Sequence, residues 1–177
     1  MSNRQTASIL HFRKELSGPP VAQNVAGIAV QNISVPGDVP AWLALRDRAM
    51  AGQHPAVRQW TNADFLSEMV DKPWWRVDRS WVAVTDKVPH EPQTIVGAVA
   101  LALREGSAGA VPVVHWLLVD PPWRRRGIGR LLLSHLEQSA WNAGWREVQL
   151  ETHAGWAAAV AFYHSIGYAP VRDRSPR

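Results

Sequence analysis

The chain has 177 residues, of which 46% are apolar and 19% are charged, and its formal net charge is +4. These values are typical of one soluble globular domain, or of one domain with an arm, and the length suffices for a core that needs no cross-links. Because the sequence contains no cysteine, it excludes disulfides, zinc-thiolate sites, iron–sulfur clusters and a cysteine nucleophile.

The N-terminal residues carry charge instead of an apolar run. Residues 1–16 include Arg4, Arg13 and Lys14 and lack the apolar segment of a signal peptide. The longest apolar run, 95–103, is too short to span a bilayer. We therefore expect a cytoplasmic protein without a membrane partner. Residues 1–26 show no clear period, so we expect an N-terminal arm before a domain of residues 27–177.

Hydrophobic periodicity predicts the remaining elements. Strands are expected at 27–34, 80–85, 94–104, 111–119, 146–152 and 168–172. Helices are expected at 39–50, from Thr61 to a stop at Lys72-Pro73, at 127–143 and at 156–166, with Asp38 and the capping-box pair Thr61 and Asp64 as start signals. The order β-α-α-β-β-β-α-β-α-β predicts an α/β fold, a mixed sheet with helices on both faces. Strands 111–119 and 146–152 should be parallel, because a helix connects them.

The loop before the third helix is basic and contains two glycines, reading R-R-R-G-I-G at 124–129. The helix begins inside it, so several N–H groups lack helical partners and, with the helix dipole, form an anion site. Gly127 and Gly129 remove side chains where a ligand must approach the backbone, and the arginines add positive charge. The pattern is neither a P-loop nor the dinucleotide-binding fingerprint. A plain strand–helix turn with surface arginines remains an alternative.

Two stretches together resemble the GCN5-related N-acetyltransferase (GNAT) superfamily. Residues 119–130 (VDPPWRRRGIGR) are similar to its acetyl-CoA motif, Arg/Gln-x-x-Gly-x-Gly/Ala. Residues 159–168 (AVAFYHSIGY) are similar to its second motif, with a tyrosine four residues before a glycine and an aromatic residue. The resemblance covers roughly residues 27–172. It implies a GNAT-like fold whose sheet splays between strands 111–119 and 146–152.

The resemblance also implies acetyl-CoA as co-substrate. Backbone amides of 125–130 would hold the pyrophosphate, and the strand end 117–119, often bulged in this family, would pair with the pantetheine arm. An amide of Leu118 or Val119 would polarise the thioester carbonyl. The residues assigned to acetyl-CoA are Leu117, Leu118, Val119, Arg124, Arg125, Arg126, Gly127, Ile128, Gly129, Arg130, Trp156 and Phe162.

Catalytic roles follow from the same resemblance. Tyr163 would be the general acid for the leaving thiolate. His115 is the first candidate for the general base, because the ordinary pKa of histidine suits proton transfer near neutral pH. Glu151 and His153 are the second choice and share one face of their strand. Trp156 stands where many family members have an asparagine that contacts the cofactor, which puts that contact in doubt.

The acceptor site should involve the early helices. Trp60, Trp74 and Trp75 lie there, and the nearby acidic residues are Asp64, Glu68 and Asp71. Aromatic and acidic groups together suit a cationic or aromatic amine.

The sequence thus predicts an acetyl-CoA-dependent N-acetyltransferase that acts on a primary amine of a small molecule or peptide by direct attack in a ternary complex. A non-catalytic acyl-CoA-binding module is the alternative. Nucleic-acid binding is not favoured, because the arginines are expected on a solvated surface, and a homodimer is possible.

Overall fold

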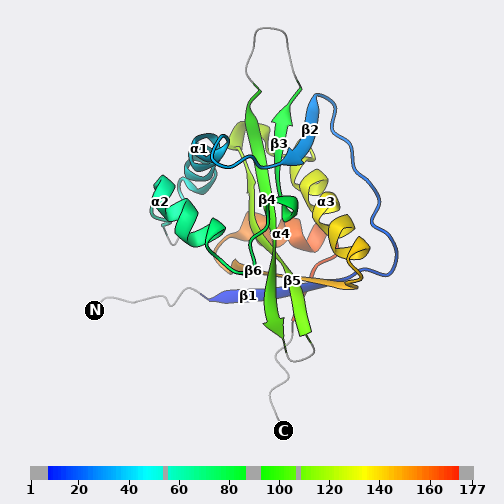
Figure 1. The fold of residues 1–177 in the computed structure, drawn as a ribbon. Helices are drawn as coiled ribbons and strands as arrows, with labels where there is room; N and C mark the ends of the chain where they lie inside the picture. The colour runs from blue at the N-terminus through cyan, green and yellow to red at the C-terminus, as the bar shows by residue number, and fades with distance from the viewer. Residues whose placement is uncertain (1–7, 54–55, 87–92, 107–108, 172–177) are drawn as a thin grey trace, which may run out of the picture.

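A computed structural model describes residues 8–53, 56–86, 93–106 and 109–171 (Figure 1). Within these residues seven strands form one sheet, in the order β2-β3-β4-β5-β6-β1-β7. The strands are β1 (Ile9–Glu15), β2 (Ile28–Asn32), β3 (Ser80–Thr85), β4 (Ile95–Gly106), β5 (Gly109–Val119), β6 (Glu147–His153) and β7 (Ala169–Pro170). The helices are α1 (Val39–Met50), α2 (Asn62–Phe65), α3 (Ile128–Asn142) and α4 (Ala157–Ser165).

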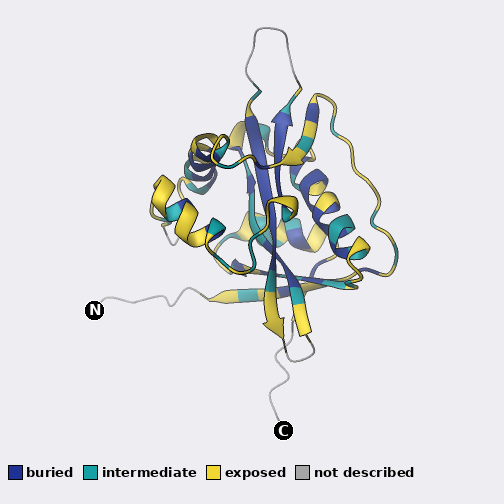
Figure 2. Cartoon of the chain, viewed as in Figure 1, coloured by how far each residue is buried: buried dark blue, intermediate teal, exposed yellow. Residues whose placement is uncertain are grey.

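Helices cover both faces of this sheet, as predicted for the α/β class. β3 and β4 alternate between the two cores: Trp81 and Ala83 pack on the face of α3 and α4, whereas Val82 and Val84 pack on the face of α1 and α2. The central strands are buried on both faces, and the exposed residues lie mainly on the outer sides of the helices (Figure 2). β5 and β6 are parallel, as their connecting helix predicted.

The expectation for the N-terminal residues needs a correction. Residues 9–15 of the expected arm are a strand, which pairs antiparallel with β6 on one side and with β7 on the other. The alternation was hard to recognise because its less exposed positions are Leu10, Phe12 and Lys14, and a lysine interrupts the apolar pattern. The Lys14 ammonium is tolerated at this half-buried position because it donates to both oxygens of the buried Glu137 carboxylate, at 2.9 and 2.8 Å.

The remaining differences are local. The helix expected from Thr61 is a short α2, followed by a π-helical turn at Leu66–Val70. Its capping box is confirmed, since Thr61 and Asp64 bond reciprocally. Asp38 precedes α1, but its carboxylate accepts from the Ser34 amide and not from the helix. Residues 1–7 and 172–177, from the expected arm and last strand, lie outside the described residues.

In the described part of the chain, no helix combines the length and apolar character needed to cross a bilayer.

Candidate functional site: a gap between β5 and β6

β5 carries a bulge shortly before its end. Ala100 pairs with His115 and Ala98 pairs with Leu118, so β5 has one more residue than β4 between these pairs. The extra residue coincides with a left-handed backbone at Trp116, whose φ is 51°. A bulge was expected in this region, and the structure centres it on Trp116 and Leu117.

The ladder between β5 and β6 ends before the bulge. Their parallel ladder consists of one residue pair, Val113 and Gln149. Beyond that pair, the β5 backbone has no ladder partner on the side of β6 in the described structure. The predicted splay is therefore present, and it exposes the edge of β5 immediately before the basic loop.

The loop turns tightly into α3. Residues Pro121–Trp123 form a 3₁₀ turn, and positive φ values follow at Arg125 (65°) and Gly127 (87°). The first helical bond of α3 runs from the Leu131 amide to the Gly127 carbonyl at 2.9 Å. No described residue accepts a hydrogen bond from the six amides of 125–130. Several amides at the start of a 15-residue helix thus remain available, which is the arrangement that binds anions.

Helix α1 holds this loop from the opposite face of the sheet. Arg48 at its C-terminal end makes a bidentate ion pair with the buried Asp120, with Nη2 2.7 Å from Oδ2. Arg124 donates to the carbonyls of Val119 at 3.2 Å and Ala49 at 2.8 Å. The Arg124 side chain therefore fixes the loop, a role that its predicted contribution of charge to the anion site did not include.

The other loop arginines differ from one another. Arg126 lies over the ring of Trp123, at 4.9 Å from its centre. Arg130 donates to the Ser165 hydroxyl at 3.2 Å, at the end of α4. Arg125 is exposed at the tip of the turn. All three keep positive charge close to the open amides.

The two glycines are required by the protein itself. Gly127 has a left-handed backbone, and a Cβ there would lie 3.3 Å from Val25. A Cβ on Gly129 would lie 3.0 Å from the ring of Phe162 in α4. The sequence predicted that both glycines allow the close approach of a ligand to the backbone. The structure explains Gly127 by backbone conformation and Gly129 by the packing of Phe162, while Ile128 between them is a buried core residue.

Tyr163 lies in the core on the α3 and α4 face. It is 8% exposed and packs near Phe12, Phe162 and Tyr168. Burial raises the pKa of Tyr163 well above its ordinary value. Its hydroxyl therefore stays protonated near neutral pH, as a proton donor requires.

His115 and Glu151 lie on the opposite face. The ring of Trp74 meets His115 edge-on at 4.6 Å. Burial, reinforced by the positive charge of Arg104 and opposed by Glu151, lowers the pKa of His115 to about 4. His115 is thus neutral at pH 7, but it is a weaker base than its ordinary pKa suggested. Glu151 is paired with Arg104 at 2.7 Å and with His11 at 3.4 Å.

His153 and Trp156 form a pair where β6 leads into α4. Their rings lie 4.6 Å apart. Among the described residues, neither Nδ1 of His153 nor Nε1 of Trp156 has a hydrogen-bond partner, although both atoms are buried. Trp156, the departure from the family pattern, thus has a buried indole N–H at the sequence position of the family's asparagine.

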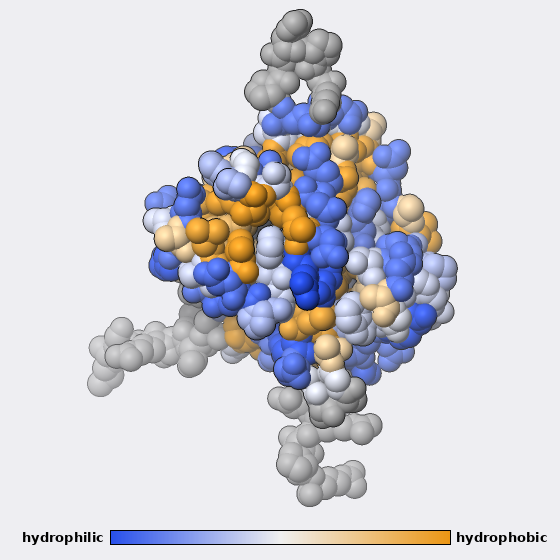
Figure 3. All heavy atoms as spheres, viewed as in Figure 1, coloured by the Kyte–Doolittle hydropathy of each residue, from blue (hydrophilic) through white to orange (hydrophobic). Residues whose placement is uncertain are grey.

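Aromatic side chains gather around the bulge on the α1 and α2 face. Trp116 meets Trp60 at 4.9 Å and Trp42 at 6.1 Å, both edge-on. We call Trp42, Trp60 and Trp116 the tryptophan cluster. Apolar residues collect over α1, α2 and the adjacent strands on this face, with hydrophilic residues around them (Figure 3). Trp60 and Trp74, which the sequence assigned to the acceptor region, contact Trp116 and His115 of β5.

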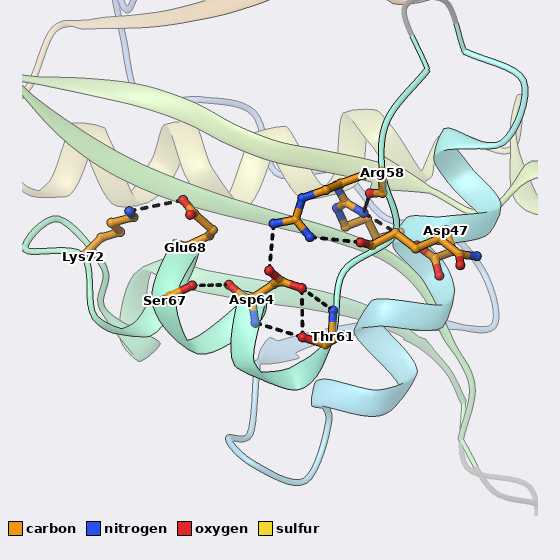
Figure 4. A network of polar contacts seen from close by, with 9 residues as sticks. Asp47, Arg58, Thr61, Asp64, Ser67, Glu68 and Lys72 are labelled. Carbon is orange, nitrogen blue, oxygen red and sulfur yellow. Dashed lines mark hydrogen bonds and ion pairs between the residues drawn. The ribbon is translucent and has the colours of Figure 1, made fainter.

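Two of the acidic residues expected to attract a cationic acceptor already have cationic partners. Asp64 accepts from Arg58 at 2.7 Å and from Thr61, and Lys72 lies 3.1 Å from Glu68 (Figure 4). The hydrogen bond from Arg58 lowers the pKa of Asp64 strongly, with further bonds from Thr61. These carboxylates stabilise the α2 region, which weakens the prediction of a cationic acceptor.

Three residues near the gap were not assigned from the sequence: Arg46, Arg104 and Asp120. Asp120 stands inside the acetyl-CoA motif and directly before two prolines, which was a usable signal. Arg46 and Arg104 stand in a helix and a strand without a motif, so only their tertiary contacts identify them.

The fold is a seven-stranded mixed sheet covered by helices on both faces, and comparison with known proteins gives its family. The model of the acetyltransferase (GNAT) family matches residues 46–168, and the chain belongs to this family. A mycothiol acetyltransferase of Thermobispora bispora is 30% identical over 91% of this chain, and one of Nocardiopsis dassonvillei is 34% identical over 92%. The chain spans about half of each, 53% and 52%.

Solved structures agree in fold. A GCN5-related N-acetyltransferase from Sphaerobacter thermophilus superposes with a TM-score of 0.72 at 22% identity, covering 92% of this chain and 48% of that protein. An aminoglycoside N-acetyltransferase in complex with CoA superposes with a TM-score of 0.63 at 16% identity, covering 89% and 97%.

Proposed function

We propose that the chain is an acetyl-CoA-dependent N-acetyltransferase that acetylates a primary amine of a small molecule or peptide. The observation that carries the proposal is the row of unbonded amides at 125–130, directly after a bulged strand that has separated from its neighbour. The amides suit the pyrophosphate of CoA, and the open edge of β5 at 117–119 suits the amide-containing pantetheine arm. Membership of the GNAT family supports both assignments.

Further cofactor contacts are proposed around these two elements. The charges of Arg125, Arg126 and Arg130 favour the phosphates. Trp156, at the sequence position of the family's asparagine, is proposed to lie beside the pantetheine arm. Phe162 supports the loop by packing on Gly129.

The chemistry proposed is direct attack in a ternary complex. The neutral amine nitrogen forms a bond to the thioester carbonyl carbon while the carbon–sulfur bond breaks. An amide of Leu118 or Val119 stabilises the negative charge on the carbonyl oxygen. Tyr163 protonates the leaving thiolate and then regains a proton from solvent. The proton lost by the amine passes to His115, or to Glu151, His153 or a water molecule.

The two catalytic candidates lie on opposite sides of the sheet. Tyr163 belongs to the core under α3 and α4, whereas His115 faces the tryptophan cluster. The β5–β6 gap is where the two faces meet. This arrangement favours acetyl-CoA entering from the side of α3 and the acceptor from the side of α1 and α2.

The test combines binding with turnover. Acetyl-CoA binding is measured by isothermal titration, and CoA release by a thiol-reactive dye, for which the cysteine-free chain gives no background. The acceptors are tryptamine, spermidine, kanamycin and a peptide with N-terminal alanine. We expect binding together with release that depends on one acceptor. Absence of binding at millimolar acetyl-CoA contradicts the proposal, and binding without release favours the non-catalytic module.

A further inference from the structure

The bulge residue Trp116 has a backbone that its own side chain disfavours. Its φ of 51° lies in the left-handed region, which bulky residues rarely adopt. Such a conformation persists only when surrounding contacts hold it, and such residues concentrate at functional sites. The amides that follow, at 117–119, are proposed to pair with the pantetheine arm and, at Leu118 or Val119, to bond the thioester carbonyl. The contacts of Trp116 therefore control the geometry of those amides.

Arg46 of α1 contacts Trp116 through a cation–π interaction, whereas the other neighbours of Trp116 are aromatic rings. Its guanidinium carbon lies 4.9 Å from the centre of the Trp116 ring and 4.2 Å from that of Trp60. The two rings meet edge-on, so one planar cation contacts both. Arg46 thus connects α1 and the segment before α2 to the bulge in β5.

Arg46 is also held by a hydrogen bond to the segment before α2. It is 1% exposed, and its Nη1 donates to the Arg58 carbonyl at 3.0 Å. Arg58 is itself fixed by its ion pair with Asp64, the capping residue of α2 (Figure 4). The orientation of Arg46 is therefore determined by residues outside the tryptophan cluster.

Packing alone does not account for a cation at this position. The nearest carboxylate oxygen, Oδ1 of Asp47, is 3.6 Å from Nη1, and no described residue accepts from the buried Nε. Burial lowers the pKa of Arg46, which reflects the cost of keeping the charge there. An apolar side chain of similar size generally fills such a space at lower electrostatic cost.

We propose that Arg46 is a positioning residue for acetyl transfer, which holds Trp116, and with it the β5 bulge, in the conformation that presents the amides of 117–119. The inference rests on the proposed acetyl transfer. The contact needs a planar group that faces two rings. Lysine keeps the charge but lacks this shape, so it replaces arginine only in part.

The test compares Arg46→Met, Arg46→Lys and a control, Arg146→Met. Arg146 also stacks on a tryptophan, at 3.6 Å from the Trp141 ring, but lies at the far end of α3. We expect Arg46→Met to lower kcat about tenfold to a hundredfold, because small displacements of catalytic groups have effects of this size. The Kd for acetyl-CoA should change less than about threefold, because the 125–130 amides are untouched. Arg46→Lys should be intermediate and Arg146→Met unchanged.

The readouts separate positioning from a purely structural role. A kcat for Arg46→Met equal to that of the wild type overturns the inference, as does an equal loss in Arg146→Met. If Arg46→Met does not fold, a wild-type kcat in Arg46→Lys overturns it. If the wild type releases no CoA with any acceptor, the proposed function fails instead. The backbone amide shifts of 116–118 in the folded variant then decide whether Arg46 holds the bulge.

Discussion

The two sides of the β5–β6 gap are built in different ways. On the side of α3, the site consists of backbone amides from consecutive residues, 125–130, and the arginines among them are largely exposed. On the side of α1 and α2, the site consists of side chains brought together from distant segments, chiefly Arg46, Trp60, Trp74 and His115. Backbone amides suit a co-substrate that is the same in every reaction, such as acetyl-CoA. Side chains from several segments suit an acceptor, for which the protein must be specific.

This difference leads to separate expectations for mutations on each side. Changes on the α3 side should alter acetyl-CoA affinity. Changes on the α1 and α2 side should alter turnover or acceptor use while acetyl-CoA affinity stays constant.

The largest effect is expected for Tyr163→Phe, which is the exception to this division, because Tyr163 lies on the α3 side but is proposed to act on the leaving thiolate and not to bind acetyl-CoA. Loss of a general acid should lower kcat by about a hundredfold or more, with acetyl-CoA affinity nearly constant. Because burial raises the pKa of Tyr163, the wild-type rate should show no loss of this acid between pH 6 and about 9. The pH dependence of CoA release checks both points. Tyr168→Phe, at the only other tyrosine, is the control, and an equal loss there would contradict the assignment.

His115 should make stability depend on pH. Its pKa is about 4 in the folded chain and about 6.5 when unfolded, so between these values the unfolded chain binds more protons. The stability that comes from keeping His115 neutral is complete above pH 6.5 and is lost as the pH falls toward 4. It amounts to roughly 3 kcal/mol at most.

Urea unfolding between pH 7.5 and 4.5 checks this dependence. His115→Gln should lose less stability than the wild type over this range, and the exposed His164→Gln should follow the wild type. Parallel curves for wild type and His115→Gln would show that His115 is not the buried neutral group.

Gly127→Ala should weaken acetyl-CoA binding about tenfold or more. The left-handed backbone disfavours a Cβ, and a shift of the turn would misdirect one or more amides that bond a charged phosphate. Gly144→Ala is a matched control, since Gly144 has a φ of 92° at the other end of α3 and open space around its Cβ position. Calorimetry should show wild-type affinity for this control, despite a similar loss of stability. Equal affinity losses would place the phosphate site elsewhere.

The smallest effect is expected for Thr61→Ala. It removes one half of the capping box of α2 and should cost about 1 kcal/mol of unfolding free energy. Acceptor KM should rise, because Asp64 positions Arg58 behind Arg46. Acetyl-CoA affinity should not change. Ser67→Ala, which loses the bond from its hydroxyl to the Asp64 carbonyl in the preceding turn, is the comparison in chemical unfolding.

The sequence predicted the loop at 124–129 and the start of α3 close to where the structure has them. The motif at 124–129 lies in adjacent residues, and helix-start geometry follows directly from such a pattern. The alternation of β3 to β6 and the parallel β5–β6 pair were predicted for the same reason. The missed features depend on contacts between distant residues. Strand β1 has a lysine at a half-buried position whose partner Glu137 lies 123 residues away.

The pKa of His115 was mispredicted on similar grounds. An ordinary value was assumed, whereas Trp74 and Arg104, from other elements, determine its surroundings. Arg46 would have been assigned to a solvated helix face by composition alone, and its burial follows only from the meeting of α1 with β5.

The position of β1 between β6 and β7 has a consequence for the order of folding. Ile9 pairs with His153 and Arg13 with Ala169, so β1 acquires its neighbours only after β6 and β7, far along the chain, have been made. At ordinary synthesis rates this delay is roughly ten to thirty seconds. During that time β2 to β5 have their antiparallel partners, whereas β1 remains an unpaired edge segment. Closing the sheet is thus the most non-local step for this chain, and contacts of such sequence separation slow folding.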